Sequence, residues 1–373
     1  MPELKQWQLP LMHKVLITGA GKVGSLIASL LFGSGDYDVY LADLDFTGQD
    51  IKRLLATQPA IKTITIDVKD TKKIVNFLMQ NTIVAVISSL PYFLNSHIAT
   101  AAKTAAVHYF DLTEDTTVTQ FIKDLSVDAK SAFVPQCGIA PGFIGIVANS
   151  LIQEFDDCIR AELRVGALPQ RVNNALHYSL TWSTEGLINE YCNKCISIEH
   201  RKLTVVQPLE GLERIQCDGS EYEAFNTSGG LGNLAELYSG KIQFLNYKTI
   251  RYPGHCEKVR FMMHDLQLNA DRPILQTILE RALPKTYQDL VILYVTVAGL
   301  SNNVLIEKSY FKKIYPMIIH GLEWSAIQLS TAAGMCTVVD LILSQTPQLR
   351  GFVSQEAFNL SDILSNRFGI YFA

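Results

Sequence analysis

The fold is decided by the segment Lys14-Val-Leu-Ile-Thr-Gly-Ala-Gly-Lys-Val-Gly24. Its apolar first half predicts a short buried strand, and the spacing of apolar residues over 23–32 predicts a helix. The glycines therefore form the pattern G-x-G-x-x-G between a strand and a helix, which is the context of a dinucleotide-binding turn. In this turn Gly19 permits the tight bend, Gly21 lets the backbone approach a pyrophosphate, and Gly24 lets the helix pack closely on the strand.

The remainder of the first 140 residues alternates strands with helices. Apolar runs predict strands at 38–42, 63–67, 83–88, 108–112 and 131–135, and helices at 71–79 and 97–106. Such alternation predicts an α/β fold of the Rossmann type, a doubly wound parallel sheet with helices on both faces. We assign residues 1–140 to this dinucleotide-binding domain.

The pattern changes after about residue 150, where several segments alternate polar and apolar residues. Strands are predicted at 159–165, 176–182, 242–251, 290–297 and 304–310. Alternation of this kind favours a mixed or antiparallel sheet, so we assign 141–320 to a second α+β domain that binds substrate and mediates dimerisation. Helical spacing over 324–343 predicts a helix that returns to the first domain, which residues 321–373 would complete.

The residues that would hold the dinucleotide follow from the strand ends. Lys22 and Val23 lie in the glycine turn, where free N–H groups face phosphate. Asp43 ends the second strand, where a carboxylate binds ribose hydroxyls and repels a 2′-phosphate, so NAD is favoured over NADP; Asp45 is the competing candidate. The later strand ends supply further cofactor candidates, namely Asp67, Val68, Ser88, Ser89, Leu90, Pro91, Cys137 and Gly138.

Composition narrows the class of protein. The 373 residues are 48% hydrophobic and 18% charged, typical of a globular protein with a core, and the net charge of −4 argues against a nucleic-acid partner. The apolar run 290–300 is too short to cross a bilayer, and residues 1–13 show no signal-peptide core. Seven scattered cysteines suit reduced thiols in a cytoplasmic protein, and Cys192-x-x-Cys195 supplies only two of four zinc ligands, so no metal site is expected.

Several motifs together resemble the saccharopine dehydrogenase-like family, most closely its lysine-oxidising members. Besides the glycine turn, the resemblance rests on the segments 109–114, 137–142, 165–169, 182–191, 227–231 and 248–255. It implies an enzyme that oxidises a C–N bond, transferring hydride from the ε-carbon of lysine to NAD and releasing ammonia and a semialdehyde. It also implies a homodimer.

Amine oxidation needs a base that takes a proton from the ammonium group. We expect Asp111 or Glu114, which follow a strand end, to act as base or to bind the amine, although Asp111 could instead cap a helix. His255 could exchange protons near neutral pH, and Arg251 could hold a carboxylate through two parallel hydrogen bonds; a structural histidine and a surface ion pair are the alternatives. The remaining substrate-binding candidates are Tyr92, Gly166, Leu168, Pro169 and Thr227.

Two other functions remain open from the sequence. A saccharopine or carboxynorspermidine dehydrogenase would act on a secondary amine with an extra carboxylate arm, for which Arg164, Arg171 and Arg214 are candidate partners. A non-catalytic NAD-binding protein is favoured by Ala167, which replaces a family glycine, and by Trp182, which replaces a smaller aromatic residue. Both departures would narrow the substrate cleft.

Overall fold

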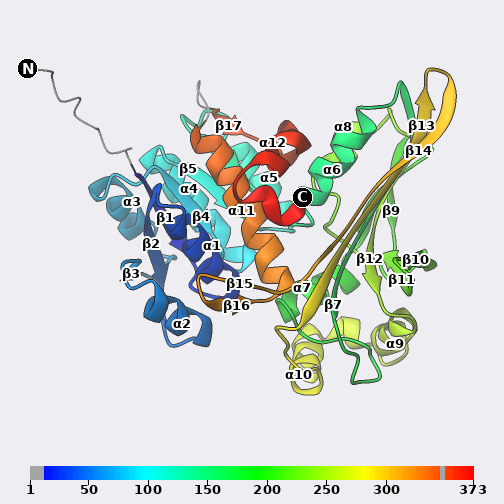
Figure 1. The fold of residues 1–373 in the computed structure, drawn as a ribbon, viewed down its shortest axis with the longest axis horizontal. Coiled ribbons are helices and arrows are strands. Elements are labelled where there is room, and N and C mark those ends of the chain that lie inside the picture. The colour runs from blue at the N-terminus through cyan, green and yellow to red at the C-terminus, as the bar shows by residue number, and fades with distance from the viewer. Residues whose placement is uncertain (1–11, 345–348) are drawn as a thin grey trace, which may run out of the picture.

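The computed structural model describes residues 12–344 and 349–373, which form two large sheets and a small hairpin (Figure 1). The expectation of no signal-peptide core concerns residues 1–13, and residues 1–11 of this segment lie outside the described residues. The first sheet has seven parallel strands in the order β17-β6-β5-β4-β1-β2-β3. These strands are β1 (His13–Thr18), β2 (Tyr37–Asp43), β3 (Lys62–Thr65), β4 (Ala85–Ser88), β5 (His108–Asp111), β6 (Ala132–Val134) and β17 (Gly351–Phe352).

Helices cover both faces of this sheet because successive strand residues point to opposite sides. Val15 and Ile17 of β1 belong to the core shared with α1, α2 and α11, whereas Leu16 packs in the core formed with α3, α4 and α5. The predicted Rossmann sheet is therefore confirmed. The helices are α1 (Lys22–Gly33), α2 (Gln49–Thr57), α3 (Thr71–Gln80), α4 (Asn95–Ala105), α5 (Thr116–Leu125) and α11 (Ala326–Ser344).

The second sheet has eight strands and mixed direction, as expected. Its central strand β7 pairs in parallel with β12 and antiparallel with β13. The strands are β7 (Asp157–Pro169), β8 (Cys195–Glu199), β9 (Lys202–Val206), β10 (Glu213–Cys217), β11 (Ser220–Asn226), β12 (Phe244–Arg251), β13 (Asp289–Ser301) and β14 (Val304–Ile314). The remaining elements are α6 (Phe143–Ile152), α7 (Thr184–Cys192), α8 (Leu234–Tyr238), α9 (His255–Arg260), α10 (Arg272–Ala282), β15 (Met317–Ile319), β16 (Leu322–Trp324) and α12 (Leu360–Ser365).

The predicted strand at 176–182 is wrong. Only Leu180 makes a β-type contact there, an isolated bridge to Lys285. Tyr178 and Leu180 are buried in a cluster with residues of α7, α9 and α10, so their alternation reflects burial against helices rather than membership of a sheet. This extended segment leads directly into α7, whose first turn is capped by the Ser183 hydroxyl.

The C-terminal part of the chain returns to the first domain, as the helical spacing predicts. In Figure 1, α11 and α12 lie among the N-terminal elements, and β17 pairs in parallel with β6 at the edge of the sheet. Helix α11 is long and apolar enough to cross a membrane by length and composition, but 78% of its most apolar window is buried inside the structure. Such burial is that of a core helix.

Candidate active site

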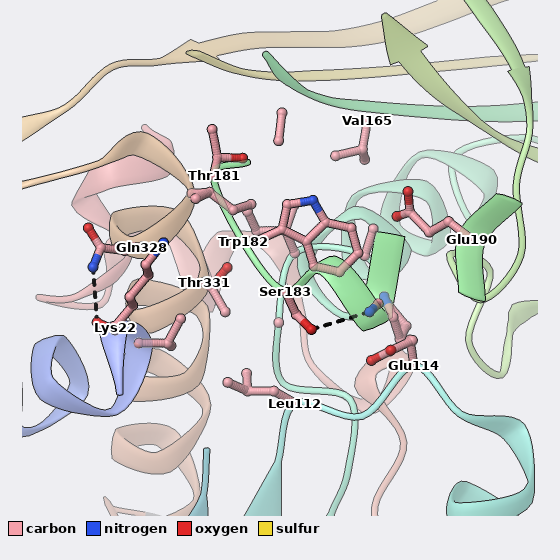
Figure 2. A pocket seen from close by; sticks show the side chains of 18 of the residues that line it. Lys22, Leu112, Glu114, Val165, Thr181, Trp182, Ser183, Glu190, Gln328 and Thr331 are labelled. Carbon is pink, nitrogen blue, oxygen red and sulfur yellow. Dashed lines mark hydrogen bonds between the residues drawn. The ribbon is translucent and has the colours of Figure 1, made fainter. Parts of the chain in front are cut away.

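A cavity of about 470 Å³ lies between the two sheets, at the carboxyl ends of β1, β4 and β5 (Figure 2). This is the edge at which open α/β sheets bind ligands. Three groups of residues meet there. They come from the glycine turn, from the loops after β4, β5 and β6, and from β7, α7 and β12. The lining includes Gly21, Lys22, Val23, Ser89, Leu90, Pro91, Tyr92, Glu114, Gly138, Val165, Ala167, Thr181, Trp182, Glu185, Gly186, Glu190, Arg251 and Gln328.

The glycine turn has the geometry that a dinucleotide requires. Gly19 has φ of +98°, and a Cβ at this position would lie 2.6 Å from the Ser89 carbonyl oxygen. A Cβ on Gly24 would lie 1.9 Å from the Gly19 carbonyl oxygen, whereas the space around Gly21 is open. The N-terminus of α1 has no side-chain cap, so its first N–H groups are free to bind phosphate oxygens. The turn therefore fits the pyrophosphate of NAD or NADP.

Asp43 lies beside this turn, since its carboxylate accepts hydrogen bonds from the Ala20 N–H at 2.6 Å and the Leu44 N–H at 2.6 Å. The competing Asp45 instead accepts from Thr47 of its own loop. The end of β2 thus presents Asp43 to the nucleotide turn. This position suits contact with a ribose.

The other cofactor candidates divide into two groups. Ser89, Leu90, Pro91 and Gly138 line the cavity together with the glycine turn. Six candidates lie outside the lining, namely Gly19, Gly24, Asp67, Val68, Ser88 and Cys137. Among them, Asp67 accepts from the Lys69 N–H, Ser88 donates to Asn95, and Cys137 is buried and donates to the Val134 carbonyl.

Asp111 does not reach the cavity, contrary to its expected role as a base. Its fully buried carboxylate accepts hydrogen bonds from the Tyr109 hydroxyl at 2.7 Å, the Thr113 N–H at 2.9 Å and the Gln136 N–H at 3.1 Å. Burial raises the pKa of Asp111 to about 6, and these donors oppose that rise. Asp111 therefore fixes the two loops that follow β5 and β6, and its part in the site is to position them.

Glu114 does line the cavity, in the loop that Asp111 holds. Burial raises its pKa above the ordinary value, with smaller contributions from neighbouring carboxylates. The glycine-rich loop 227–232 packs against it, since a Cβ on Gly229 would lie 3.2 Å from the Glu114 Cβ. Thr227 of that loop is buried outside the cavity lining, so its position does not support the expected contact with substrate.

Two carboxylates of the cavity, Glu185 and Glu190, were missed by the sequence reasoning. Both lie on α7, within the motif 182–191, and the Glu190 carboxylate points into the cavity in Figure 2. Burial raises the pKa of Glu190 to about 7, and Arg251 opposes this rise. A carboxyl group with such a pKa can exchange a proton near neutral pH. The Ser183 cap and the two glutamates after it were the available signal.

Arg251 is buried at the cavity wall, and four of its donors are already used. Nε donates to the Tyr191 hydroxyl at 2.9 Å, Nη1 to Thr249 at 2.6 Å and to a main-chain carbonyl, and Nη2 to Glu190 at 3.3 Å. A guanidinium has five N–H groups, so one remains for a ligand. The expected two-bond grip on a carboxylate is therefore wrong, because the protein itself occupies the fork.

His255 lies behind this wall rather than in the cavity. Its ring nitrogens lie 2.6 Å from the Leu176 carbonyl oxygen and 2.9 Å from the Tyr191 hydroxyl. Burial, followed by the charge of Arg251, lowers the pKa of His255 to about 3, so the ring stays neutral in ordinary buffers. His255 lies outside the cavity lining and holds Tyr191, which in turn holds Arg251, so its position does not support the expected proton exchange.

Two of the substrate-binding candidates on β7, Gly166 and Leu168, alternate with the residues of this strand that line the cavity. Val165 and Ala167 line the cavity, and because side chains alternate along a strand, Gly166 and Leu168 face the other side. A Cβ on Gly166 would lie 2.8 Å from the Ile250 side chain, so this glycine permits close strand packing. The Pro169 carbonyl accepts from Tyr252, away from the cavity, whereas Tyr92 lines it as expected.

Trp182 occupies the middle of the cavity. In Figure 2 its indole lies between Lys22 on one side and Glu190 on the other. The indole Nε1 donates to the Tyr178 hydroxyl at 3.1 Å, and the ring lies so close to Gly186 that a Cβ there would be 2.4 Å away. The position of the indole is thus fixed by Tyr178 and by the absence of a side chain at Gly186.

The arginines proposed for an extra carboxylate arm lie elsewhere. Arg164 pairs with Glu162 and Glu213, and Arg214 pairs with Glu221. Neither they nor Arg171 are among the described residues that line the cavity. Within the described ranges, the cations of the lining are Lys22 and Arg251, against the three glutamates 114, 185 and 190.

The nucleotide turn and the cavity beside it define an NAD(P)-dependent oxidoreductase that acts on amino donors. Two family models agree, the saccharopine dehydrogenase NADP binding domain over residues 15–134 and the saccharopine dehydrogenase C-terminal domain over residues 138–368. The chain belongs to the saccharopine dehydrogenase family.

Two solved structures share the whole fold. Saccharopine dehydrogenase (L-Glu forming) from Saccharomyces cerevisiae matches with a TM-score of 0.75 and 16% identity, over 92% of this chain and 94% of that one. Homospermidine synthase from Legionella pneumophila, solved with NAD, matches with a TM-score of 0.62 and 12% identity, over 96% of this chain and 89% of that one. At these identities the likeness establishes the fold.

Proposed function

We propose that this protein is an NAD-dependent dehydrogenase that oxidises the C–N bond at the ε-carbon of L-lysine. The observation that carries the proposal is the charge of the cavity. Glu114, Glu185 and Glu190 line it against two cations, Lys22 and Arg251, and Arg251 is already paired with Glu190. Such a lining favours a ligand with more ammonium groups than carboxylates, and lysine has two ammonium groups and one carboxylate.

Each side chain has a separate task in this proposal. Glu190, whose pKa is raised to about 7, takes a proton from the substrate ammonium and so supplies the neutral amine that oxidation requires. Glu114 and Glu185 attract the cationic ends of the substrate, and the free N–H of Arg251 donates to its carboxylate. The glycine turn 19–24 and Asp43 would hold NAD, which would supply the acceptor for the hydride of the ε-carbon. Water completes the reaction, giving a semialdehyde and ammonium.

The choice of NAD rests on Asp43. Its carboxylate lies at the end of β2 beside the glycine turn, where it would accept hydrogen bonds from ribose hydroxyls and repel a 2′-phosphate. Replacing Asp43 by alanine is expected to raise the Kd of NAD⁺ and to narrow the preference over NADP⁺. Equal Kd values for the two dinucleotides in the unmodified protein would contradict the proposed choice.

A second candidate is a polyamine-type secondary amine with a single carboxylate, such as carboxynorspermidine. The same acidic lining favours it, since its nitrogens are cationic. Saccharopine is disfavoured, because its three carboxylates would meet the three glutamates of the cavity. The two candidates differ in their products. Oxidation of lysine would release ammonium, whereas oxidation of the secondary amine would release a second amine.

The test measures NADH formation with L-lysine, L-ornithine, diamines and carboxynorspermidine across about pH 7–10, where the amine becomes neutral. With lysine, NADH and ammonium are expected to form in equal amounts. The variant Glu190→Gln is expected to have a kcat about 100-fold lower. Glu210→Gln, an exposed glutamate outside the cavity, is the matched control. No NAD⁺ reduction with lysine, with turnover of carboxynorspermidine, would replace the first candidate by the second.

A further inference from the structure

A second pocket, of about 250 Å³, adjoins the main cavity at the start of α1. The two share Lys22, Thr181 and Gln328 as lining residues. The second pocket draws on both domains, because the glycine turn and α2 form one side and the segment before β13 forms the other. Its other lining residues are Gln49, Lys285, Thr286, Tyr287 and Ser325.

Two lysines face this pocket without an acidic partner. Neither Lys22 nor Lys285 forms an ion pair within residues 12–344 and 349–373. The two carboxylates whose charges act on Lys22 are bound by other donors. Asp50 accepts from the Tyr287 hydroxyl at 2.8 Å, and Asp289 accepts from the Ala326 and Ile327 N–H groups at 2.5 and 3.0 Å.

The electrostatics of the pocket favour an anion. Burial lowers the pKa of Lys22 most, and the charge of Lys285 lowers it further. The charges of Asp50 and Asp289 oppose this with smaller effects. Every other side chain of the lining is an uncharged hydroxyl or amide. Two ammonium groups among neutral donors are a typical setting for a phosphate group.

We propose that Lys22 and Lys285 form a phosphate site that holds the dinucleotide from both domains. Lys22 lies in the turn that faces the pyrophosphate, and Lys285 approaches the same space from the second domain. The proposal rests on NAD(P) binding by the family, and it is independent of which amine is oxidised. Both the diphosphate of either cofactor and the 2′-phosphate of NADP have the required chemistry.

The site also connects cofactor binding to the substrate cavity. Leu180 forms a β-bridge with Lys285, and its N–H donates to the Pro284 carbonyl at 2.8 Å. The next two residues, Thr181 and Trp182, line the substrate cavity. A phosphate bound by Lys285 would therefore lie beside the segment that places the indole.

The test measures the Kd of NAD⁺ and of NADP⁺ for the full chain and for Lys285→Met by titration calorimetry. The expected result is a Kd about tenfold higher for the variant, with a weaker dependence on salt, because one charged contact to phosphate is lost. Lys202→Met, an exposed lysine on β9, is the matched control and is expected to leave Kd unchanged. Unfolding by urea checks that both variants are equally stable.

The outcomes separate the possibilities. A similar loss for NAD⁺ and NADP⁺ identifies the diphosphate as the bound group, and a loss confined to NADP⁺ identifies the 2′-phosphate. Unchanged Kd values for both dinucleotides would overturn the proposal, as would a rise only in the KM of the amine. Because Kd is measured without substrate, failure of lysine as the substrate leaves this test intact.

Discussion

Replacing Glu190 by glutamine removes a carboxyl group whose folded environment favours its protonated form. The side chain is 15% exposed and contacts Arg251 at 3.3 Å. Burial raises the pKa of Glu190 from 4.5 to about 7. Glutamine has the same shape and can still accept a hydrogen bond from Arg251, but it cannot ionise. The variant therefore isolates the cost of charging this one group inside the protein.

The magnitude follows from linkage between proton binding and folding. Since the folded pKa lies above the unfolded one, the stability that Glu190 contributes is fully present below about pH 4.5 and is lost as the pH rises through about 7. At about 1.4 kcal/mol for each unit of pKa, the difference between 4.5 and about 7 amounts to roughly 3 kcal/mol. Glu190→Gln should remove this dependence.

The assay is urea unfolding of the unmodified protein and of Glu190→Gln at about pH 5 and about pH 8. The unfolding free energy of the variant minus that of the unmodified protein is expected to rise by about 2–3 kcal/mol between these two pH values. Glu210→Gln serves as the control for removing one negative charge at an exposed position. If the two unfolding free energies changed in parallel between these pH values, the argument that burial governs Glu190 would be refuted.

Three further predictions concern single positions. Gly24→Ala places a Cβ 1.9 Å from the Gly19 carbonyl oxygen, so NAD⁺ binding is lost in calorimetry and urea unfolding shows a destabilisation of about 1–3 kcal/mol. Gly186→Ala displaces the Trp182 indole, so tryptophan emission shifts and the KM of the amine rises about tenfold while the Kd of NAD⁺ stays unchanged. His255→Gln leaves the acidic limb of the kcat/KM profile in place, because the pKa of this histidine is already lowered to about 3; a limb that disappears would restore its catalytic role.

Much of the first domain could be predicted because its central strands are buried on both faces. Such strands appear in a sequence as continuous apolar runs, as Lys14–Thr18 and 83–88 do, and glycines mark the turn. The segment 176–182 alternates polar and apolar residues as the strands of the second domain do, yet it does not pair into a sheet. Alternation reports burial on one side, and only the tertiary structure decides whether that side meets a strand or a helix.

The candidate site was harder to predict, because lying near a cavity and facing it are different properties. Asp111 and Glu114 follow the same strand, yet one binds main-chain N–H groups below the cavity and the other lines it. Arg251 and His255 are four residues apart and are separated by a bend with Gly254 at φ of +87°. Which of two neighbouring polar residues meets substrate depends on loop hydrogen bonds that no residue pattern encodes.

The return of α11 to α1 has a consequence for how the protein is made. Cys336 of α11 packs against the main chain of Ile27 in α1, so the apolar surface of one of the first helices is covered by one of the last. At a synthesis rate of about 5–20 residues per second, α1 waits for some tens of seconds on the ribosome before its partner exists. During that interval the nascent first domain presents an uncovered helix and an unpaired sheet edge beside β6. Apolar surface and sheet edges that stay uncovered for such an interval are prone to aggregation, which is the hazard that chaperones counter.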